Sequence, residues 1–231
     1  NYEDQIEVIL VDNMSTDYSV KRARSLFANT KIVELKEYKP GLSLNKGIEK
    51  ASGDFIVCIS AHCIPADENW LTNLIKPLKN EEIAAVYGRQ IPTPNSNPKD
   101  KRDLWLTFGK DDRMQIKDPF LHNGNSAYRR KDLIKNPFSE EMTNIEDRGW
   151  ASKELGKGKK IFYTASAKVY HDHGIHQTGC DKRLSGVISM MDKLHSKYDS
   201  FESYYGSNIN LVEPSLALLI FISERYGDID I

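Results

Sequence analysis

The sequence predicts an α/β fold in which a mostly parallel sheet is flanked by helices, followed by a helical C-terminal extension. In the first half, short apolar runs alternate with longer segments of helical spacing, a pattern typical of parallel strands joined by right-handed crossovers. The C-terminal part shows mainly helical patterns. With 231 residues, of which 39% are hydrophobic, the chain can bury one substantial core. We expect one α/β domain over residues 1–178 and a helical extension over 179–231.

Three strand-helix pairs open the chain. Each strand is apolar almost throughout, as strands buried on both faces are, and each following segment carries apolar residues at helical spacing. The expected strands are 6–12, 31–36 and 54–60, and the expected helices are 17–28, 43–52 and 67–80. Asp67 is a suitable N-cap for the third helix.

The pattern beyond residue 80 is less regular. A further strand is expected over 83–91, and the segment 92–103 is rich in proline and asparagine, which predicts a loop. The remaining expectations are a short strand and turn over 121–130, a helix over 144–158 ended by glycine, one or two strands over 159–174, and helices over 181–198 and 214–227.

Charge and cysteine usage limit the classes of partner. Lysine and arginine total 32 against 33 acidic residues, so the formal charge of -1 creates no field that would gather nucleic acid. The three cysteines lack Cys-x-x-Cys spacing, which argues against a disulfide framework and favours a reduced, cytoplasmic setting. No apolar run approaches the roughly 18 residues of a membrane span. A peripheral contact with the inner face of the membrane remains an alternative.

Polar residues follow the ends of two expected strands. Asp12 ends the first strand, and Ser60 begins the polar stretch after the third. Ligands of open parallel sheets bind in the crevice beyond the carboxyl ends of the strands. A carboxylate at Asp12 can accept a hydrogen bond from a ribose hydroxyl or a base N–H. Residues 15–17, by contrast, are equally well explained as helix caps.

Histidines also follow two strand ends. His62 comes after the third strand, and His171 and His173 come at the end of a later one. Imidazoles from two strand ends can grip one divalent cation. Side chains two apart in an extended segment point the same way, so either His171 or His173 can be the ligand. Ordinary hydrogen bonding of these histidines is the competing interpretation.

Two more segments have both a structural and a chemical interpretation. Glu146 and Asp147 begin an expected helix, where they either complement the helix dipole or supply a general base. The segment 122–130 is either a simple turn or a loop that approaches a sugar or diphosphate. In the second case Gly124 allows the close approach, and Asn123 and Asn125 donate hydrogen bonds.

Several well-known motifs are absent from the sequence. No Gly-x-Gly-x-x-Gly follows the first strand, and neither a Gly-Lys-Ser/Thr loop nor a Gly-x-Ser-x-Gly elbow occurs. Dehydrogenases, P-loop nucleotide hydrolases and α/β-hydrolases are therefore disfavoured.

Taken in chain order, these segments resemble family 2 glycosyltransferases of the GT-A fold, over roughly residues 5–176. The matching pieces are "EVILVDNMSTD", "GLSLNKGIEKASGDFIVCISAHCIPADENWLTNLI", "HNGNSAYRR" and "NIEDRGWASKELGKGKKIFYTASAKVYHDH". The variant with "SAHCIP", "YGRQIP" and "HNGNS" is most similar to bacterial enzymes of surface-polysaccharide assembly, including rhamnosyltransferase-like members. The resemblance implies a GT-A-type, Rossmann-like sheet, a nucleoside-diphosphate sugar donor, and a glycan or lipid-linked saccharide as acceptor.

The resemblance also implies roles for individual residues. Asp12 and Lys46 are expected to approach the nucleotide. Asp147, next to Glu146, falls on the usual catalytic base of an inverting transfer of a hexosyl or deoxyhexosyl group.

A metal site is implied at the second strand end. The Asp-x-Asp motif of the family falls on Ser60-Ala61-His62, which makes Ser60 a neighbour of the ribose and metal, and His62 a metal ligand. His171 or His173 falls where a further ligand is found in this fold. Imidazole in place of carboxylate shifts the expected cofactor from magnesium toward manganese. Weak or absent metal dependence is the alternative.

One departure from the family's pattern bears on function. Its members normally have a strand and a helix before the "EVILVD" strand, and this sequence starts at "NYEDQIEVIL" without them. The alternative to an active transferase is therefore a catalytically degenerate or truncated nucleotide-sugar-binding module.

Overall fold

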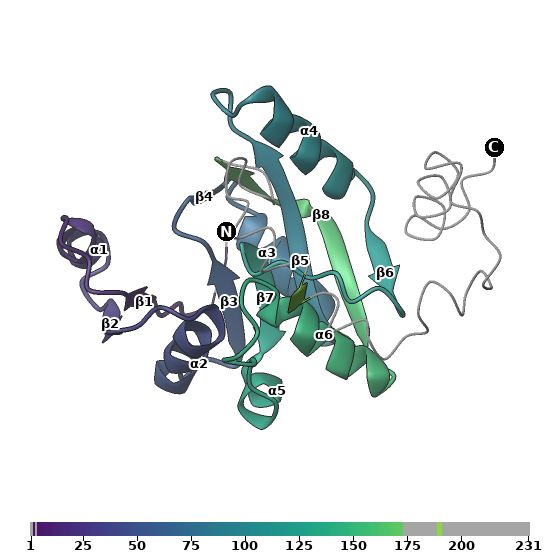
Figure 1. The fold of residues 1–231 in the computed structure, drawn as a ribbon, viewed down its shortest axis with the longest axis horizontal. Helices are drawn as coiled ribbons and strands as arrows, with labels where there is room; N and C mark the ends of the chain where they lie inside the picture. The colour runs from purple at the N-terminus through teal and green to yellow at the C-terminus, as the bar shows by residue number, and fades with distance from the viewer. Residues whose placement is uncertain (1, 3, 173–188, 191–231) are drawn as a thin grey trace. The chain divides into compact units, whose positions relative to one another are not determined.

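The computed structural model describes residues 2, 4–172 and 189–190 of the chain (Figure 1). The chain divides into two units, Asn1–Met190 and Met191–Ile231, and the described residues belong to the first. Almost all of the expected extension over 179–231 thus lies outside the described residues. No helix in the described part is both long and apolar enough to span a bilayer.

The N-terminal strands form a small sheet of their own. Strand β1 (Ile9–Asp12) is followed by helix α1 (Ser19–Leu26) and strand β2 (Lys31–Glu34). The two strands pair in parallel, with Ile9 opposite Lys31 and Asp12 opposite Glu34. The strand-helix-strand unit expected from the sequence is therefore confirmed.

The main sheet has the strand order β3-β7-β5-β8-β4, and β6 adds to β8. The strands are β3 (Phe55–Ile59), β4 (Cys63–Pro65), β5 (Ile83–Pro92), β6 (Arg113–Gln115), β7 (Asn125–Arg129) and β8 (Lys160–His171). Strands β5 and β8 run parallel, whereas β7 enters antiparallel between β3 and β5. The expected α/β sheet flanked by helices is confirmed, but the main sheet is mixed rather than mostly parallel. Only β5 and β8 pair in parallel, because β7 inserts antiparallel between β3 and β5, and the short strands β4 and β6 pair antiparallel with β8.

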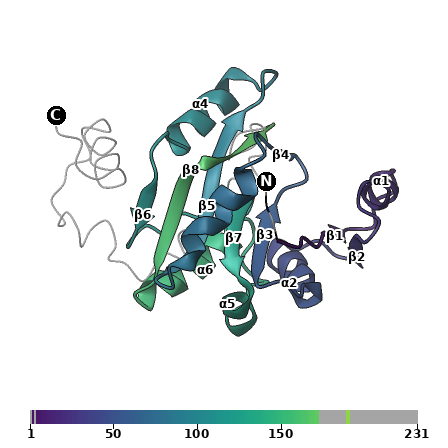
Figure 2. The ribbon, with the colours of Figure 1, turned by 180° about the vertical axis from the view of Figure 1, so that it is seen from behind.

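Helices cover both faces of this sheet (Figures 1 and 2). Alternate side chains of β5 enter different cores: Tyr87 packs in a cluster with Trp150, and Val86 packs in a cluster with Leu74 on the opposite face. The helices are α2 (Pro40–Lys50), α3 (Trp70–Ile75), η1 (Lys76–Lys79), α4 (Pro98–Thr107), α5 (Arg130–Lys135) and α6 (Glu146–Gly156).

Helix α4 corrects the expectation of a loop over 92–103. Its N-cap residue, Asn97, accepts a hydrogen bond on its side chain from the backbone N–H of Asp100 at 3.0 Å. Pro98 occupies the first helical position, where its missing N–H costs nothing. The same proline and asparagine that predicted a loop therefore begin a helix.

Glu7 ties the N-terminal sheet to the rest of the unit. Its carboxylate accepts hydrogen bonds from the backbone N–H groups of Ser52 and Gly53, at 2.6 and 2.8 Å, in the connection between α2 and β3. It also pairs with Lys31 of β2 at 2.6 Å. The hydrogen bond from Lys31, followed by that from Ser52, lowers the pKa of Glu7 to about 2.

We expect Glu7→Gln to lower the free energy of unfolding by about 1 kcal/mol at pH 7, because the ion pair and the charge assistance of the hydrogen bonds are lost. Since the folded-state pKa of Glu7 is depressed, its contribution is present above the ordinary value of 4.5 and is lost as pH falls toward about 2. Denaturant unfolding at several pH values measures this difference. Glu37→Gln, which removes an exposed ion pair with Lys39, is the matched control. A destabilisation that is equal at pH 7 and pH 2 would contradict the prediction.

Candidate functional site

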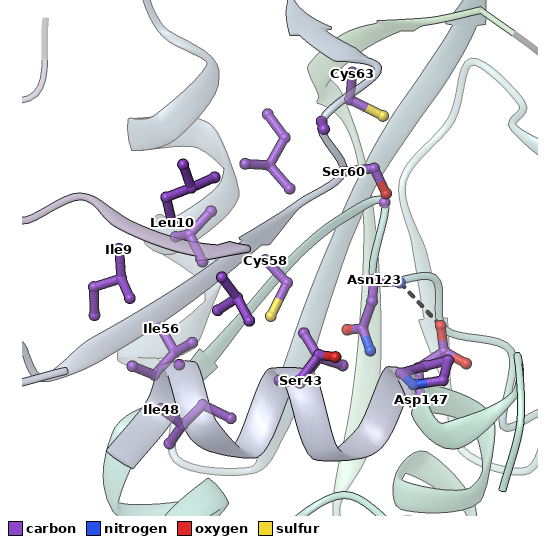
Figure 3. Close-up of a pocket in the computed structure, with 18 of the residues that line it drawn as sticks. Ile9, Leu10, Ser43, Ile48, Ile56, Cys58, Ser60, Cys63, Asn123 and Asp147 are labelled. Carbon is purple, nitrogen blue, oxygen red and sulfur yellow. Dashed lines mark hydrogen bonds between the residues drawn. The ribbon is translucent and has the colours of Figure 1, made fainter. Parts of the chain in front are cut away.

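A cavity of about 760 Å³ lies between the N-terminal sheet and the main sheet (Figure 3). It is lined by β1 and α1 on one side and by α2 and β3 on the other. Within the described part of the chain, β1 and β3 are not hydrogen-bonded to each other. Figure 3 shows apolar side chains, including Ile9 and Ile56, toward one end, and Ser60, Asn123 and Asp147 toward the other. The cavity therefore has an apolar part and a polar part.

A tight turn follows β3 at the polar end. The backbone N–H of Cys63 donates to the carbonyl oxygen of Ser60 at 2.9 Å, and the N–H of Ser60 donates to the carbonyl oxygen of Gly124 at 3.3 Å. Ser60 and Cys63 line the cavity, whereas His62, between them, is exposed. The turn thus anchors the end of β3 to the loop before β7.

That loop is fixed by the ring of His122. The Nδ1 atom of His122 accepts a hydrogen bond from the backbone N–H of Gly124 at 3.1 Å and lies 2.9 Å from Nε2 of Gln90. Because a backbone N–H can only donate, the hydrogen-bond network assigns the proton of the neutral ring to Nε2. A Cβ atom on Gly124 would lie 2.8 Å from His122 Nδ1, so the close contact requires glycine here.

Asn123 holds the two acidic residues that begin α6. Its backbone N–H donates to Oδ2 of Asp147 at 2.9 Å, and its side-chain amide donates to Oε1 of Glu146 at 3.3 Å. The amide oxygen of Asn123 accepts hydrogen bonds from Ser126 at 2.9 Å and from the Tyr128 hydroxyl at 2.5 Å. The side chain of Asn123 is therefore engaged with its neighbours.

Asp147 lines the cavity although it is only 7% exposed. Burial raises the pKa of Asp147, and it outweighs the opposing effects of the Arg148 guanidinium and of the backbone N–H groups of Asn123 and Arg148. The N–H of Arg148 donates to Oδ1 at 2.8 Å. A carboxylate held by two backbone donors and with a raised pKa is suited to accept a proton.

A cluster of His62, Cys63 and His171 lies beside the same turn. Their candidate ligand atoms all lie within 4.8 Å of one another. Cys63 and His171 are directly opposite in the pairing of β4 with β8, and the rings of His62 and His171 have centroids 4.8 Å apart. The structure thus brings together two of the expected metal-ligand candidates. His173 lies outside the described residues.

Cys63 was not among the residues expected here. Its adjacency to His62 was the only signal in the sequence, because its pairing opposite His171 depends on strand order. Burial raises the pKa of the Cys63 thiol to about 12.

Three expected nucleotide-binding residues do not line the cavity in the described structure. The buried carboxylate of Asp12 accepts a hydrogen bond from the Ser15 N–H at 3.0 Å, and half-buried Lys46 pairs with Glu49 at 2.9 Å. Asn125 is fully buried: its amide donates to the Ala167 carbonyl at 2.9 Å, and its oxygen accepts from Trp70 Nε1 at 2.9 Å. Ser60, Asn123 and Gly124 do line the cavity.

Comparison with solved structures identifies proteins of similar fold. S. aureus TarS (residues 1–349) matches with a TM-score of 0.59 at 16% identity, over 86% of this chain and 58% of that one. The mannosyltransferase PcManGT from Pyrobaculum calidifontis, in complex with GDP-Man and Mn²⁺, matches with a TM-score of 0.56 at 18% identity, over 95% and 70%. At these identities the likeness shows the fold alone, and it confirms the expected GT-A-type sheet.

Sequence comparison identifies the family. The O-antigen chain rhamnosyltransferase WbaN of Salmonella anatum is 29% identical over 72% of this chain and 56% of its own length. RfbN of Salmonella typhimurium, with the same description, is 30% identical over 72% and 57%. The chain therefore spans a little over half the length of these relatives. The family described as Glycosyl transferase family 2 matches residues 1–136, and the chain belongs to that family.

Proposed function

We propose that this chain carries out inverting transfer of a sugar from a nucleoside-diphosphate sugar to a hydroxyl group of a glycan or polysaccharide precursor. The observation that carries this proposal is the placement of Asp147, a buried carboxylate that lines the cavity, is oriented by two backbone N–H groups and has a raised pKa. In a member of glycosyl transferase family 2, such a group is the natural candidate for the base.

The similar proteins support the choice of substrates. The two Salmonella relatives are described as rhamnosyltransferases of O-antigen chains, which favours a deoxyhexose donor and a surface-polysaccharide acceptor here. PcManGT was solved with GDP-Man and Mn²⁺, a nucleoside-diphosphate sugar and a divalent cation. The 760 Å³ cavity falls within the size range of pockets that bind small molecules.

The reaction follows from the placement of Asp147. Its carboxylate takes the proton of the acceptor hydroxyl while that oxygen forms a bond to the anomeric carbon. The bond from the anomeric carbon to the phosphate oxygen breaks, and its electron pair leaves with the nucleoside diphosphate. Attack from the face opposite the leaving group inverts the anomeric centre.

The leaving diphosphate requires positive charge or hydrogen-bond donors near the turn after β3. Ser60 lines the cavity there and is a candidate donor through its hydroxyl group. A divalent cation held by His62 and His171 would supply positive charge at the same place. In this proposal Asp12 and Lys46 contact the nucleotide only if their side chains leave their present partners.

A nucleotide-sugar-binding module without turnover is the second candidate. The observation that favours it concerns the two strands that face the cavity. In the described part of the chain, β1 and β3 belong to different sheets and are not hydrogen-bonded to each other. Product analysis separates the two candidates: a glycosylated acceptor together with free nucleoside diphosphate supports the transferase, whereas binding of the donor without product supports the module.

We expect Asp147→Asn to lower the turnover number on the order of 100-fold to 10,000-fold, because an amide cannot accept the acceptor proton. Donor binding should change little, because the substitution leaves the shape of the side chain and the rest of the cavity lining unchanged; one of the two backbone N–H groups keeps an oxygen acceptor, and the other loses its acceptor to the amide NH2. Single-turnover transfer of a labelled sugar measures the first quantity, and calorimetric titration measures the second.

The control for this variant is Asp54→Asn, which changes an exposed carboxylate directly before β3. Turnover of the control should match that of the unaltered protein. Near-normal turnover of Asp147→Asn would remove Asp147 from the role of base.

We also expect the rate of transfer to rise with pH through the pKa of Asp147. Burial favours the neutral acid, so the inflection should lie above the ordinary aspartate value of 3.8, and the rate should fall below it as the base becomes protonated. A pH-rate profile, recorded over the range in which circular dichroism shows the fold intact, measures the inflection. If the residual rate of Asp147→Asn retained the same acid limb, another group would be responsible for it.

A further inference from the structure

The side chains at the edge of the cavity form an unusual set of cation ligands. His62 and His171 offer imidazole nitrogens and Cys63 offers a sulfur atom, and among the described residues no carboxylate belongs to the cluster. Magnesium and manganese prefer oxygen ligands, whereas imidazole and thiolate together suit zinc and related ions. The donor set therefore fits the expected manganese or magnesium poorly.

We propose that His62, Cys63 and His171 form a thiolate-imidazole site that binds a zinc-class ion, with Cys63 as its third ligand. The inference deepens the proposed function, on which its catalytic role rests, by assigning the class of cation at the polar end of the cavity. Formation of the site exchanges the thiol proton of Cys63 for the ion and releases that proton to solvent.

The fold holds two of the ligands before any ion arrives. Cys63 and His171 are opposite each other in an antiparallel pair, and their exposed fractions are 7% and 1%. His62 is held one residue before Cys63 by the turn that begins at Ser60. Two buried ligands and one exposed ligand leave a side from which an ion can enter.

The distances are close to those of a coordinated ion. Zinc bonds of about 2.3 Å to sulfur and 2.0–2.1 Å to nitrogen place tetrahedral ligand atoms roughly 3.5 Å apart. The three ligand atoms here lie within 4.8 Å of one another. Side-chain rotations that move these atoms by about an ångström bring them to the spacing of a tetrahedral zinc site. Three protein ligands leave a fourth position open, as in catalytic zinc sites. Because Cys63 also lines the cavity, that position is available to a phosphate oxygen of the donor.

His122 lies nearby but is not a ligand in this proposal. Its ring centroid is 6.2 Å from that of His171. Its Nδ1 atom accepts the Gly124 N–H, which places the ring proton on Nε2 and leaves no nitrogen lone pair for an ion.

The test titrates the chelator-treated protein with Zn²⁺, Co²⁺ and Mn²⁺ separately, without nucleotide. We expect one equivalent of Co²⁺ to produce a sulfur-to-cobalt charge-transfer band, and Zn²⁺ to abolish it by competition. Cys63→Ala should lose the band. Zinc binds most nitrogen and sulfur sites more tightly than manganese, so the ratio of the two affinities is the informative quantity. Loss of a residue that only hydrogen-bonds to a metal ligand lowers metal affinity by up to about 100-fold. Loss of Cys63, a direct ligand, should therefore lower the ratio of zinc to manganese affinity by at least about 100-fold.

Cys58→Ala is the matched control, because Cys58 is a buried cysteine outside the cluster. This control should keep both the band and the affinity ratio. His62→Ala changes an exposed side chain and should fold normally, keep the band and weaken zinc binding. The proposal is overturned if Cys63→Ala keeps the band, if His62→Ala leaves zinc affinity unchanged, or if no ion binds stoichiometrically.

Failure of this inference is distinguishable from failure of the proposed function. Sugar transfer that proceeds in chelator, by a protein that binds no zinc, would overturn the site and leave the transferase. Zinc bound through Cys63 in a protein that transfers no sugar would support the ion site and overturn the transferase.

Discussion

The hydrogen bonds of the loop before β7 hold the polar end of the cavity together. On one side of this loop, the carbonyl oxygen of Gly124 accepts the N–H of Ser60 at the end of β3. On the other, the N–H of Asn123 donates to Asp147 at the start of α6. The His122 ring closes the loop through the N–H of Gly124. The candidate base and the turn that carries two of the proposed cation ligands, His62 and Cys63, are therefore positioned by one backbone segment.

Burying two carboxylates at the N-terminus of α6 costs electrostatic free energy, because their charged forms lose contact with water. Glu146 and Asp147 are both buried, and burial raises the pKa of Asp147. The N-terminus of α6 and the backbone donors offset part of that cost. Burial also raises the pKa of Tyr128 well above its usual value, so its hydroxyl stays protonated and donates to Asn123. The same surroundings thus fix the carboxylates and make Asp147 a stronger base.

Sequence patterns located several parts of the fold and the site. The expectation that histidines at two strand ends approach each other agrees with the geometry: His62 follows the short strand β3, His171 ends β8, and their ring centroids lie 4.8 Å apart. The orientation of individual side chains was harder to predict from the sequence. Lys46 turns to Glu49 one helical turn away, and Asn125 turns into the sheet, because local pairing and burial decide these directions. Cys63 entered the cluster through the β4-β8 register, which no local pattern encodes.

The cavity joins two sheets whose facing strands are unpaired to each other in the described part of the chain, so a bound nucleotide would bridge them. Hydrogen exchange measured by mass spectrometry, with and without nucleoside diphosphates and their sugar conjugates, tests most directly whether this cavity is the donor site. The account predicts slower exchange in β1, in the turn at residues 60–63 and in the loop at residues 122–124. Protection confined to other segments, or no protection with any of these ligands, would contradict it.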